Sequence, residues 1–139
     1  MVNTRSIVQA LPDVAKANGE LEALQKQKDN ELKAMQDELN RKLDEYQKGQ
    51  STMNATAKQQ KETELQGLNQ KIQQAYQDGQ QELQKKSSEL MQPIVAKVRA
   101  AIDAVGKAGN YTYIFEEGAA IYTGSNVVDV TKEVQSKIK

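Results

Sequence analysis

Apolar residues recur every three or four positions along most of this chain, in two stretches that a short polar segment separates. In the first stretch the steps are 4, 4, 3, 4, 4 and 3, through Leu24, Lys28, Leu32, Met35, Leu39, Leu43 and Tyr46, with Lys28 as the polar exception. In the second stretch the steps repeat as 3, 4 and 4, through Leu65, Leu68, Ile72, Tyr76, Gly79, Leu83, Ser87, Leu90, Ile94, Val98, Ala101 and Val105. This spacing corresponds to about 3.67 residues per turn and predicts two helices that pack nearly straight or with a faint right-handed coil.

The polar segment between the two stretches is rich in residues that favour turns. It reads YQKGQSTMNAT, in which Gly49, Ser51, Thr52 and Asn54 interrupt the apolar periodicity. We therefore expect the chain to reverse near residues 47–56. The two helices should then form an antiparallel hairpin, an arm over residues 21–92.

Two prolines mark further boundaries. Pro12 suits the first turn of a helix, so the first long helix is expected to begin near Leu11 to Val14. Pro93 falls inside the second stretch, where apolar residues are sparse before it and dense after it: nine of the twelve residues Ile94–Val105 are apolar when Ala is counted. Because an internal proline bends a helix or marks a change in its packing, we expect the dense part to lie in a compact body and Pro93 to act as the hinge of the arm.

The rest of the body should come from both ends of the chain, residues 1–20 and 93–139. The sequence GNYTYIFEEGAAIYTGS predicts two short strands around Gly118, and the opening MVN predicts a third, very short one. The last residues predict a helix with Asp129 or Thr131 at its N-cap, Glu133 in the first turn, and Val134 and Ile138 on one face. The fold class is thus α+β, a long helical hairpin on a small β-strand body.

Such a small sheet is marginal in water, so the body is expected to assemble from several copies that merge their strands into a shared barrel or sheet. Most of the aromatic residues of the chain lie in this region. The residues expected to form the contacts between copies are Val2, Ile7, Tyr111, Tyr113, Phe115, Ile121 and Tyr122.

Composition supports an elongated molecule over a globular one. Aromatic residues make up 4% of the 139 residues and Trp is absent, which leaves little material for a large core. Lys plus Arg equals Asp plus Glu at 19 each, so the molecule has no net charge to concentrate it on nucleic acid or an anionic membrane. Pairs of an acid and a base four residues apart are expected to support the arm helices, at Glu22/Lys26, Asp29/Lys33, Asp37/Arg41, Glu38/Lys42, Asp44/Lys48 and Glu82/Lys86.

The residues that most enzymes and metal sites use are missing. The chain has neither His nor Cys, which excludes disulfides, thiolate metal sites and the commonest general base. Glu116 and Glu117 are adjacent on a predicted strand and should point to opposite faces. No Gly-rich phosphate loop is present, and the tyrosines lie in the acidic segment YTYIFEEG, which disfavours nucleic-acid binding. We therefore expect neither an enzyme nor a cofactor or metal.

Two groups of arm residues are candidates for binding a partner. The apolar stripe is interpreted first as the seam between the helices and second as a source of weak, dispersed contacts to an unfolded chain. Its members are Leu32, Met35, Leu39, Leu43, Tyr46, Leu65, Leu68, Ile72 and Tyr76, with Met53 at the tip. Lys48, Lys58 and Lys61 make the tip locally basic, either as a solvated turn or as a contact for acidic partners or lipid headgroups.

The order of these features resembles the Skp/OmpH family of periplasmic chaperones over essentially the whole chain. The residues that carry the resemblance are Val2, Asn3 and Pro12, then Glu89, Leu90, Pro93 and Ile94, then Tyr113, Ile121 and Tyr122, and finally Asp129, Val130 and Thr131. The resemblance implies a homotrimer with a small β-barrel body and three arms around a cavity. In that cavity the family holds unfolded outer-membrane proteins without ATP, which makes such proteins the expected partners. The chain departs from the family's basic character by being neutral, which weakens the expectation that the tips contact anionic lipid or lipopolysaccharide, and its first strand is short.

The expected location depends on the same resemblance. No apolar run approaches the ~18 to 20 residues that span a bilayer, and the N-terminus lacks the pattern of a secretory signal. The protein is therefore either cytosolic or a periplasmic protein whose signal was removed before Val2 and replaced by Met1 for expression. The resemblance favours the periplasm.

Two other classes of protein fit parts of the pattern. A structural or adaptor coiled-coil protein would use the arms to bind a folded partner or each other. A prefoldin-like chaperone subunit would place its strands between two terminal helices, whereas here the hairpin turn lies mid-chain and the strands lie near the ends.

Overall fold

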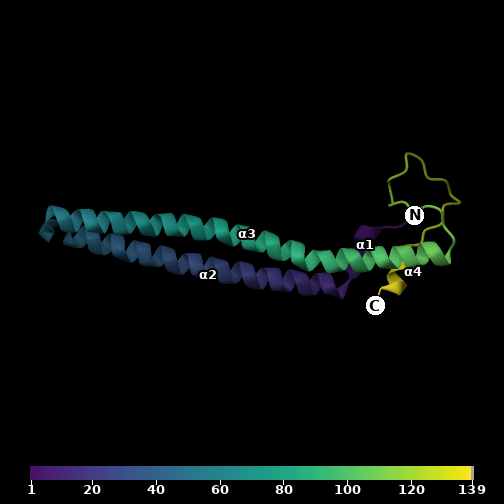
Figure 1. The fold of residues 1–139 in the computed structure, drawn as a ribbon, viewed down its shortest axis with the longest axis horizontal. Coiled ribbons are helices and arrows are strands. Elements are labelled where there is room, and N and C mark those ends of the chain that lie inside the picture. The colour runs from purple at the N-terminus through teal and green to yellow at the C-terminus, as the bar shows by residue number, and fades with distance from the viewer. Residues whose placement is uncertain (139) are drawn as a thin grey trace. The chain divides into compact units, whose positions relative to one another are not determined.

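Helices make up most of the part of the chain that the computed structural model describes, residues 1–138. They are α1 (Thr4–Ala10), α2 (Pro12–Gly49), the short 3₁₀ helix η1 (Gln50–Thr52), α3 (Ala55–Ala108) and α4 (Thr131–Lys137) (Figure 1). The chain divides into two compact units, which we call the arm unit, Glu20–Lys86, and the body unit, residues 1–19 together with residues from 87 onward.

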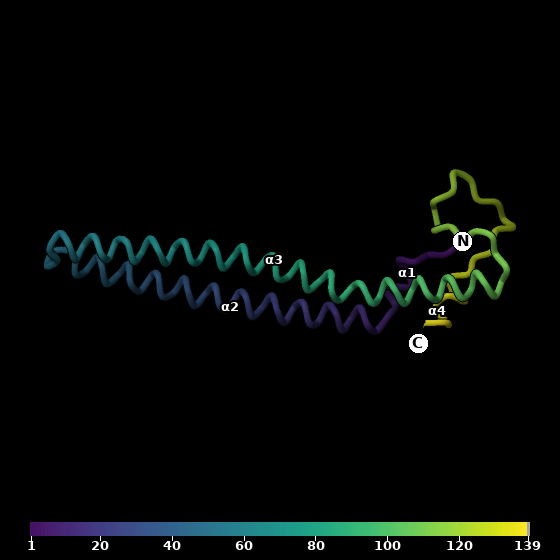
Figure 2. The backbone as a smooth tube through the Cα atoms, viewed as in Figure 1, coloured from purple at the N-terminus to yellow at the C-terminus, as the bar shows by residue number. Residues whose placement is uncertain are grey.

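In the arm unit, α2 and α3 run antiparallel and are joined through η1 at the tip (Figures 1 and 2). The predicted hairpin and its reversal are thus confirmed. Asn54 starts the second helix, because its side-chain oxygen accepts a hydrogen bond from the backbone N–H of Ala57 at 2.8 Å. The Cε atom of Met53 lies close to Gly49, 3.3 Å from where a Cβ would stand, so Met53 folds back over the turn.

The body unit begins with a short helix, α1, where the sequence had predicted only a short strand. Asn3 caps α1 by accepting a hydrogen bond from the N–H of Ser6 at 2.8 Å. The helix ends at Ala10, and the next residue, Leu11, has an extended ψ of 130°, because the following Pro12 disfavours a helical conformation in the residue before it. The long helix then starts at Pro12, as predicted.

The core of the body confirms the prediction made from the dense apolar segment. The buried positions of α3 are Ile94, Val98, Ala101 and Val105, which are the stripe positions after Pro93. The last three share one cluster with Val2, Ile7, Val130 and Val134, and α1 packs against α4. The helix continues through Pro93, so within the body unit this proline marks a change in packing without a break in the helix.

The C-terminal end of α3 is closed by a Schellman motif. Asn110 has a positive φ of 53°, the backbone N–H of Tyr111 donates to the carbonyl of Gly106 at 3.0 Å, and that of Asn110 donates to the carbonyl of Lys107 at 3.3 Å. Asn is one of the residues that adopt this left-handed conformation at modest cost. The helix stop therefore depends on Asn110.

The predicted strands are not formed in the single chain, since residues 1–138 contain one isolated parallel bridge, Val2 to Glu116, and no strand. Around it, the N–H of Val2 donates to Phe115 at 2.9 Å and the N–H of Glu117 donates to Val2 at 2.7 Å. The physical reason is that a strand needs a neighbour for its backbone groups, and among residues 1–138 the single bridge to Val2 is too short to turn residues 111–116 or 119–123 into strands.

The last helix forms as predicted, but its cap is shifted. Val130 occupies the N-cap position, where no side chain caps the helix. Asp129, one residue earlier, instead accepts hydrogen bonds from the N–H and the hydroxyl of Thr131, at 2.9 and 2.6 Å. These bonds keep the pKa of Asp129 below its ordinary value. Val134 is fully buried, as the predicted apolar face requires.

Candidate functional site: the arm seam and the exposed loop

The apolar stripe of the arm is only partly covered by the packing of α2 against α3. Leu39 is its buried member, with 7% of its surface exposed. The half-buried members are Leu32, Met35, Tyr46, Met53, Leu65, Leu68 and Ile72. Leu43 and Tyr76 are exposed, Tyr76 by 56%. The stripe therefore holds the helices together and at the same time leaves apolar surface open to solvent.

Lys28, the polar exception in the first stripe, lies against Gly79 of the second. The Cγ and Cδ atoms of Lys28 are 3.8 and 3.7 Å from the position a Cβ of Gly79 would occupy. Its ammonium group pairs with Glu82 at 2.6 Å and with Glu31 at 3.7 Å. The hydrogen bond to Glu82 is the main reason that the pKa of Lys28 is raised. At this level the seam therefore has a polar contact. The stem of Lys28 packs over Gly79, which has no side chain, and its ammonium group reaches Glu82.

A second polar contact crosses the seam nearer the tip. Lys42 of α2 pairs with Glu64 of α3, and the hydroxyl of Tyr46 donates to Glu62 at 2.7 Å. Glu64 also pairs with Lys61 at 3.3 Å. The hydrogen bond from Lys42 is the largest cause of the lowered pKa of Glu64, and the bond to Glu62 raises the pKa of Tyr46.

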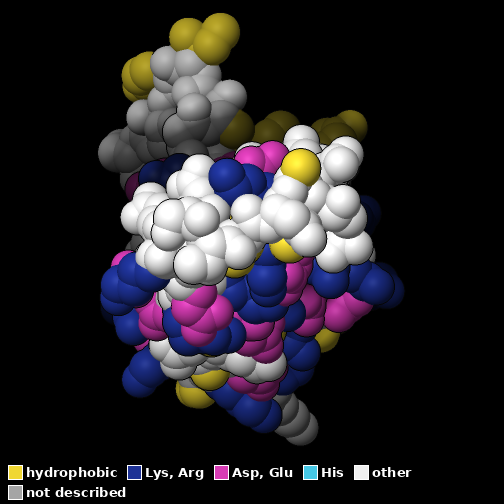
Figure 3. Space-filling view, turned by 90° about the vertical axis from the view of Figure 1, so that its left-hand side faces the viewer, with side chains coloured by type: hydrophobic (Ala, Val, Ile, Leu, Met, Phe, Trp, Pro, Cys, Tyr) yellow, Lys and Arg dark blue, Asp and Glu magenta, His cyan; other side chains and the backbone are white. Residues whose placement is uncertain are grey.

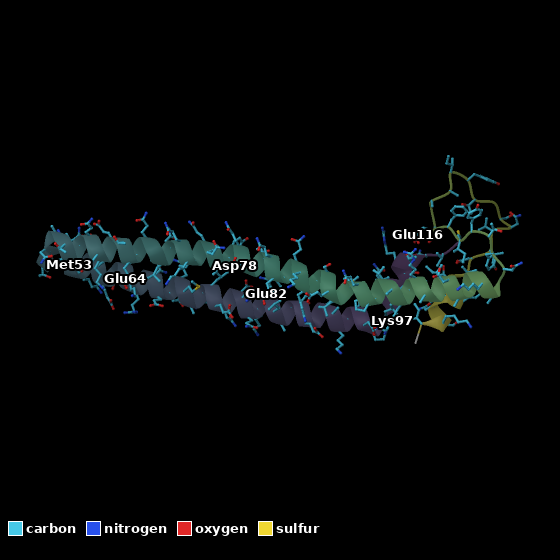
Figure 4. The ribbon with its side chains drawn as sticks, in the orientation of Figure 1. Met53, Glu64, Asp78, Glu82, Lys97 and Glu116 are labelled. Atoms are coloured by element: carbon cyan, nitrogen blue, oxygen red, sulfur yellow. The ribbon has the colours of Figure 1, made fainter. Side chains whose placement is uncertain are left out.

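These contacts agree with an antiparallel register, because the partner of a later α2 residue lies earlier in α3. Glu64 and Glu82 can be followed along α3 in Figure 4, with Met53 near the tip. The register also changes the predicted ion pairs. Asp44 and Lys48 pair as expected at 2.7 Å. Lys42 and Glu82, by contrast, pair across the seam and not with Glu38 and Lys86.

An open groove lies between these two polar contacts. It has a volume of about 530 Å³, and most of the surface that lines it is apolar. The lining residues are the apolar Leu32, Ile72 and Tyr76 and the polar Lys33, Gln36, Gln73 and Gln77. Lys33 pairs with Asp37 at 3.3 Å, one turn further along the same helix. Leu32, Ile72 and Tyr76 are stripe residues that the apolar spacing predicts, whereas the glutamines fall outside the period of the stripe and carry no signal in the sequence.

The arm tip is less basic than the sequence suggested. Lys48 pairs with Asp44 and Lys61 with Glu64, so acids outside residues 47–61 neutralise two of the three lysines, while Lys58 is half-buried. Figure 3 views the molecule from this end, where backbone and uncharged polar side chains cover the surface and both signs of charge alternate behind them. The tip offers no concentrated positive field.

The loop after α3 exposes the aromatic residues of the body. Ile121 is fully exposed, Tyr122 is 85% exposed and Tyr113 is 74% exposed, while Phe115 and Tyr111 are less so. The rings of Tyr113 and Phe115 stack with centroids 5.9 Å apart. Val2 and Ile7, by contrast, lie in the core of their own chain. Five of the seven predicted assembly residues therefore lie on the surface, and the other two hold the body together.

The N-terminal segment fastens this loop to the body. The N–H of Thr4 donates to the carboxylate of Glu116 at 2.9 Å, and the side chain of Asn3 donates to Glu117 (Figure 4 labels Glu116). Elsewhere in the body, Lys97 of α3 pairs with Asp13 of α2 at 2.7 Å. Glu116 and Glu117 were expected to point to opposite faces of a strand, but both carboxylates bind the N-terminal segment.

Within residues 1–138 there is no cluster of three or more acidic, His or Cys side chains placed to hold a metal ion. The helices of this part of the chain are also too polar, over any membrane-spanning length, to cross a bilayer.

Comparison with known proteins gives a consistent result. A family model described as outer membrane protein (OmpH-like) matches residues 1–138. The chain is 26% identical to "Chaperone protein Skp" of Pectobacterium atrosepticum over 139 residues, which cover all of this chain and 84% of that protein. It is 24% identical to "Chaperone protein Skp" of Yersinia enterocolitica, with the same coverage.

Proposed function

The chain belongs to the OmpH-like family, and from this membership we propose that it is an ATP-independent holdase chaperone. In this proposal it binds unfolded outer-membrane proteins and prevents their aggregation in the periplasm. The similarity to two proteins named chaperone supports the general class. The finer statements rest on the two surfaces described above.

The observation that carries the proposal is the half-open apolar stripe of the arm unit. A seam in which Leu39 is buried but Leu43 and Tyr76 are exposed provides apolar contacts without a closed pocket. An unfolded chain offers many apolar side chains in no fixed order, so it is best retained by many weak contacts. The equal numbers of acidic and basic residues mean that affinity should come mainly from these contacts and only weakly from charge.

The body supplies the second element, assembly into a homotrimer. The loop residues Tyr113, Ile121 and Tyr122 expose aromatic and aliphatic surface next to backbone groups that form no strand within the chain. Pairing these segments between copies would cover the side chains and satisfy the backbone in a small shared barrel. Three arms on one body would then enclose a client and multiply the weak contacts of each arm.

The test is the aggregation of an outer-membrane protein diluted from urea, followed by light scattering. We expect substoichiometric trimer to suppress the scattering with no nucleotide present, and addition of ATP to change nothing. A structural or adaptor protein that binds only folded partners would leave the aggregation unaltered. That result would contradict the proposal.

A further inference from the structure

The groove between α2 and α3 is bordered by charged side chains that are paired with one another. The charged side chain in its lining, Lys33, is paired with Asp37, and the polar contacts on either side, Lys28 with Glu82 and Lys42 with Glu64, are paired as well. A segment lying there would meet Leu32, Ile72, Tyr76 and neutral amides. Burying a charged side chain against them would cost solvation, and Lys33, the charged residue of the lining, already has Asp37 as its partner.

The amides suit an extended peptide backbone. Gln36 lies on one wall of the groove and Gln73 and Gln77 on the other. Each side-chain amide can both donate and accept hydrogen bonds, as can each peptide group of an unfolded chain. The side chains between them can therefore meet apolar surface while the neighbouring backbone finds polar partners.

The size of the groove limits what it holds. Its volume of about 530 Å³ lies within the ~300 to 1,000 Å³ that ligand pockets occupy. The lining covers little more than one helical turn of each helix, roughly 5 to 8 Å at 1.5 Å per residue. An extended chain advances about 3.3 Å per residue, so the groove has room for one large side chain and its neighbours.

We infer that this groove is an anchor site for a single aromatic or large apolar side chain of an uncharged, extended polypeptide segment, with Tyr76 as the stacking partner. The inference rests on the proposed function and deepens it, since it selects one place on the arm and one kind of client segment. Tyr76 suits this role because its ring is exposed, whereas Tyr46, the other tyrosine of the seam, is held by its hydrogen bond to Glu62. Aromatic rings also gain from offset stacking beyond the area they bury.

The probe is a capped, uncharged peptide of about ten residues, the length of a transmembrane strand, with one Trp among Gln, Ser and Thr. The protein contains no Trp, so emission at long excitation wavelength reports on the peptide alone. We expect a blue shift on titration with the full chain and an affinity that changes less than about twofold between low and high salt, because no charge pairs form. Tyr76→Ala should weaken binding by about three- to tenfold, as expected for the loss of one aromatic contact, and Tyr76→Phe should preserve it.

Matched controls separate the groove from the stripe in general. Glu62→Ala removes the acceptor of a seam hydrogen bond outside the groove, the one from Tyr46, and should leave peptide affinity unchanged. A peptide with Ser in place of Trp should not bind. Equal affinity of Tyr76→Ala and the parent protein, or a steep loss of affinity with salt, would overturn the inference.

Two further measurements distinguish this inference from the proposed function and from another occupant. If the parent protein suppresses aggregation but Tyr76→Ala binds the peptide as well as the parent, the anchor site is wrong and the chaperone activity stands. If the parent binds the peptide with the expected pattern but does not suppress aggregation, the chaperone activity is wrong and the site stands. A change in oligomeric state caused by Tyr76→Ala would assign the groove to contacts between copies and overturn the inference.

Discussion

At the scale of single residues, Asn110 decides where the longest helix ends. Its φ of 53° places it in the left-handed region, which costs an alanine about 1 to 2 kcal/mol more than a residue that adopts it readily. We expect Asn110→Ala to lower the free energy of unfolding by about 1 kcal/mol and Asn110→Gly to leave it nearly unchanged. Urea unfolding followed by circular dichroism measures both. Equal destabilisation by the two substitutions would mean that the side chain of Asn110, and not its backbone conformation, matters.

Glu64 gives the arm a predictable response to acid. Its pKa is lowered below the ordinary 4.5, mainly by the hydrogen bond from Lys42, so the native state favours its ionised form. This contribution to stability is present above pH 4.5 and is lost as the pH falls through the lowered value. We expect part of the loss of stability in acid to disappear in Glu64→Gln, measured by thermal melting between pH 7 and pH 3.

The matching control is Asp78→Asn. Asp78 accepts a hydrogen bond at 2.8 Å from Gln74, a residue of its own helix. Its removal should leave the acid response in place. An identical acid profile for Glu64→Gln and the parent would exclude the cross-helix pair as a source of the response.

At the scale of elements, the contact between Lys28 and Gly79 sets how firmly the two arm helices pack. Glycine inside a helix is less favourable than alanine by about 0.5 to 1 kcal/mol, and a Cβ at Gly79 would meet the stem of Lys28 at an ordinary contact distance of 3.7 Å. We expect Gly79→Ala to stabilise the arm by at least this amount. Gly67→Ala is the control, because nothing lies within 4 Å of a Cβ there. If both substitutions stabilise equally in urea, the stem of Lys28 adds nothing.

Pro93 lies in α3, immediately before the first buried residue of the body stripe, Ile94. A proline removes one backbone hydrogen bond from the helix, and this weakness is what would let the arm flex at its base. We expect Pro93→Ala to stiffen this point and to narrow the range of client sizes that the protein keeps soluble. The measurement compares the aggregation of small and large outer-membrane proteins. Equal suppression of both by the variant would count against a hinge.

At the scale of the whole molecule, the exposed loop should determine assembly. Phe115 and Ile121 are exposed in the single chain, so replacing both with Asp should not disturb its core. Charges would, however, be buried unpaired at a contact between copies, which is strongly unfavourable. We expect light scattering after size exclusion to give three copies for the parent protein and one for the double variant. Val95→Asp, an exposed apolar residue of α3 outside the loop, should leave the trimer intact.

Much of the architecture follows from the spacing of residues along the chain. Three features of the sequence predicted the hairpin and the buried face of α3, because helix periodicity and turn preference are local properties. They are the apolar stripes with steps of 3, 4 and 4, the turn residues near Gly49, and the higher density of apolar residues after Pro93. The short helix α1 was also locally encoded, in the cap at Asn3 and the proline after Leu11, although the strand predicted at the N-terminus hid it.

Other features depended on which residues meet in space. That Lys28 lies over Gly79 and that Lys42 pairs with Glu64 and not with Glu38 both follow from the register of α2 against α3, to which many weak contacts contribute together. The same is true of Val2 and Ile7, which are buried by partners more than ninety residues away. Local preferences determine the helices and the turn, whereas tertiary structure alone decides which side chains pair and which remain exposed, because that choice depends on the neighbours that folding supplies.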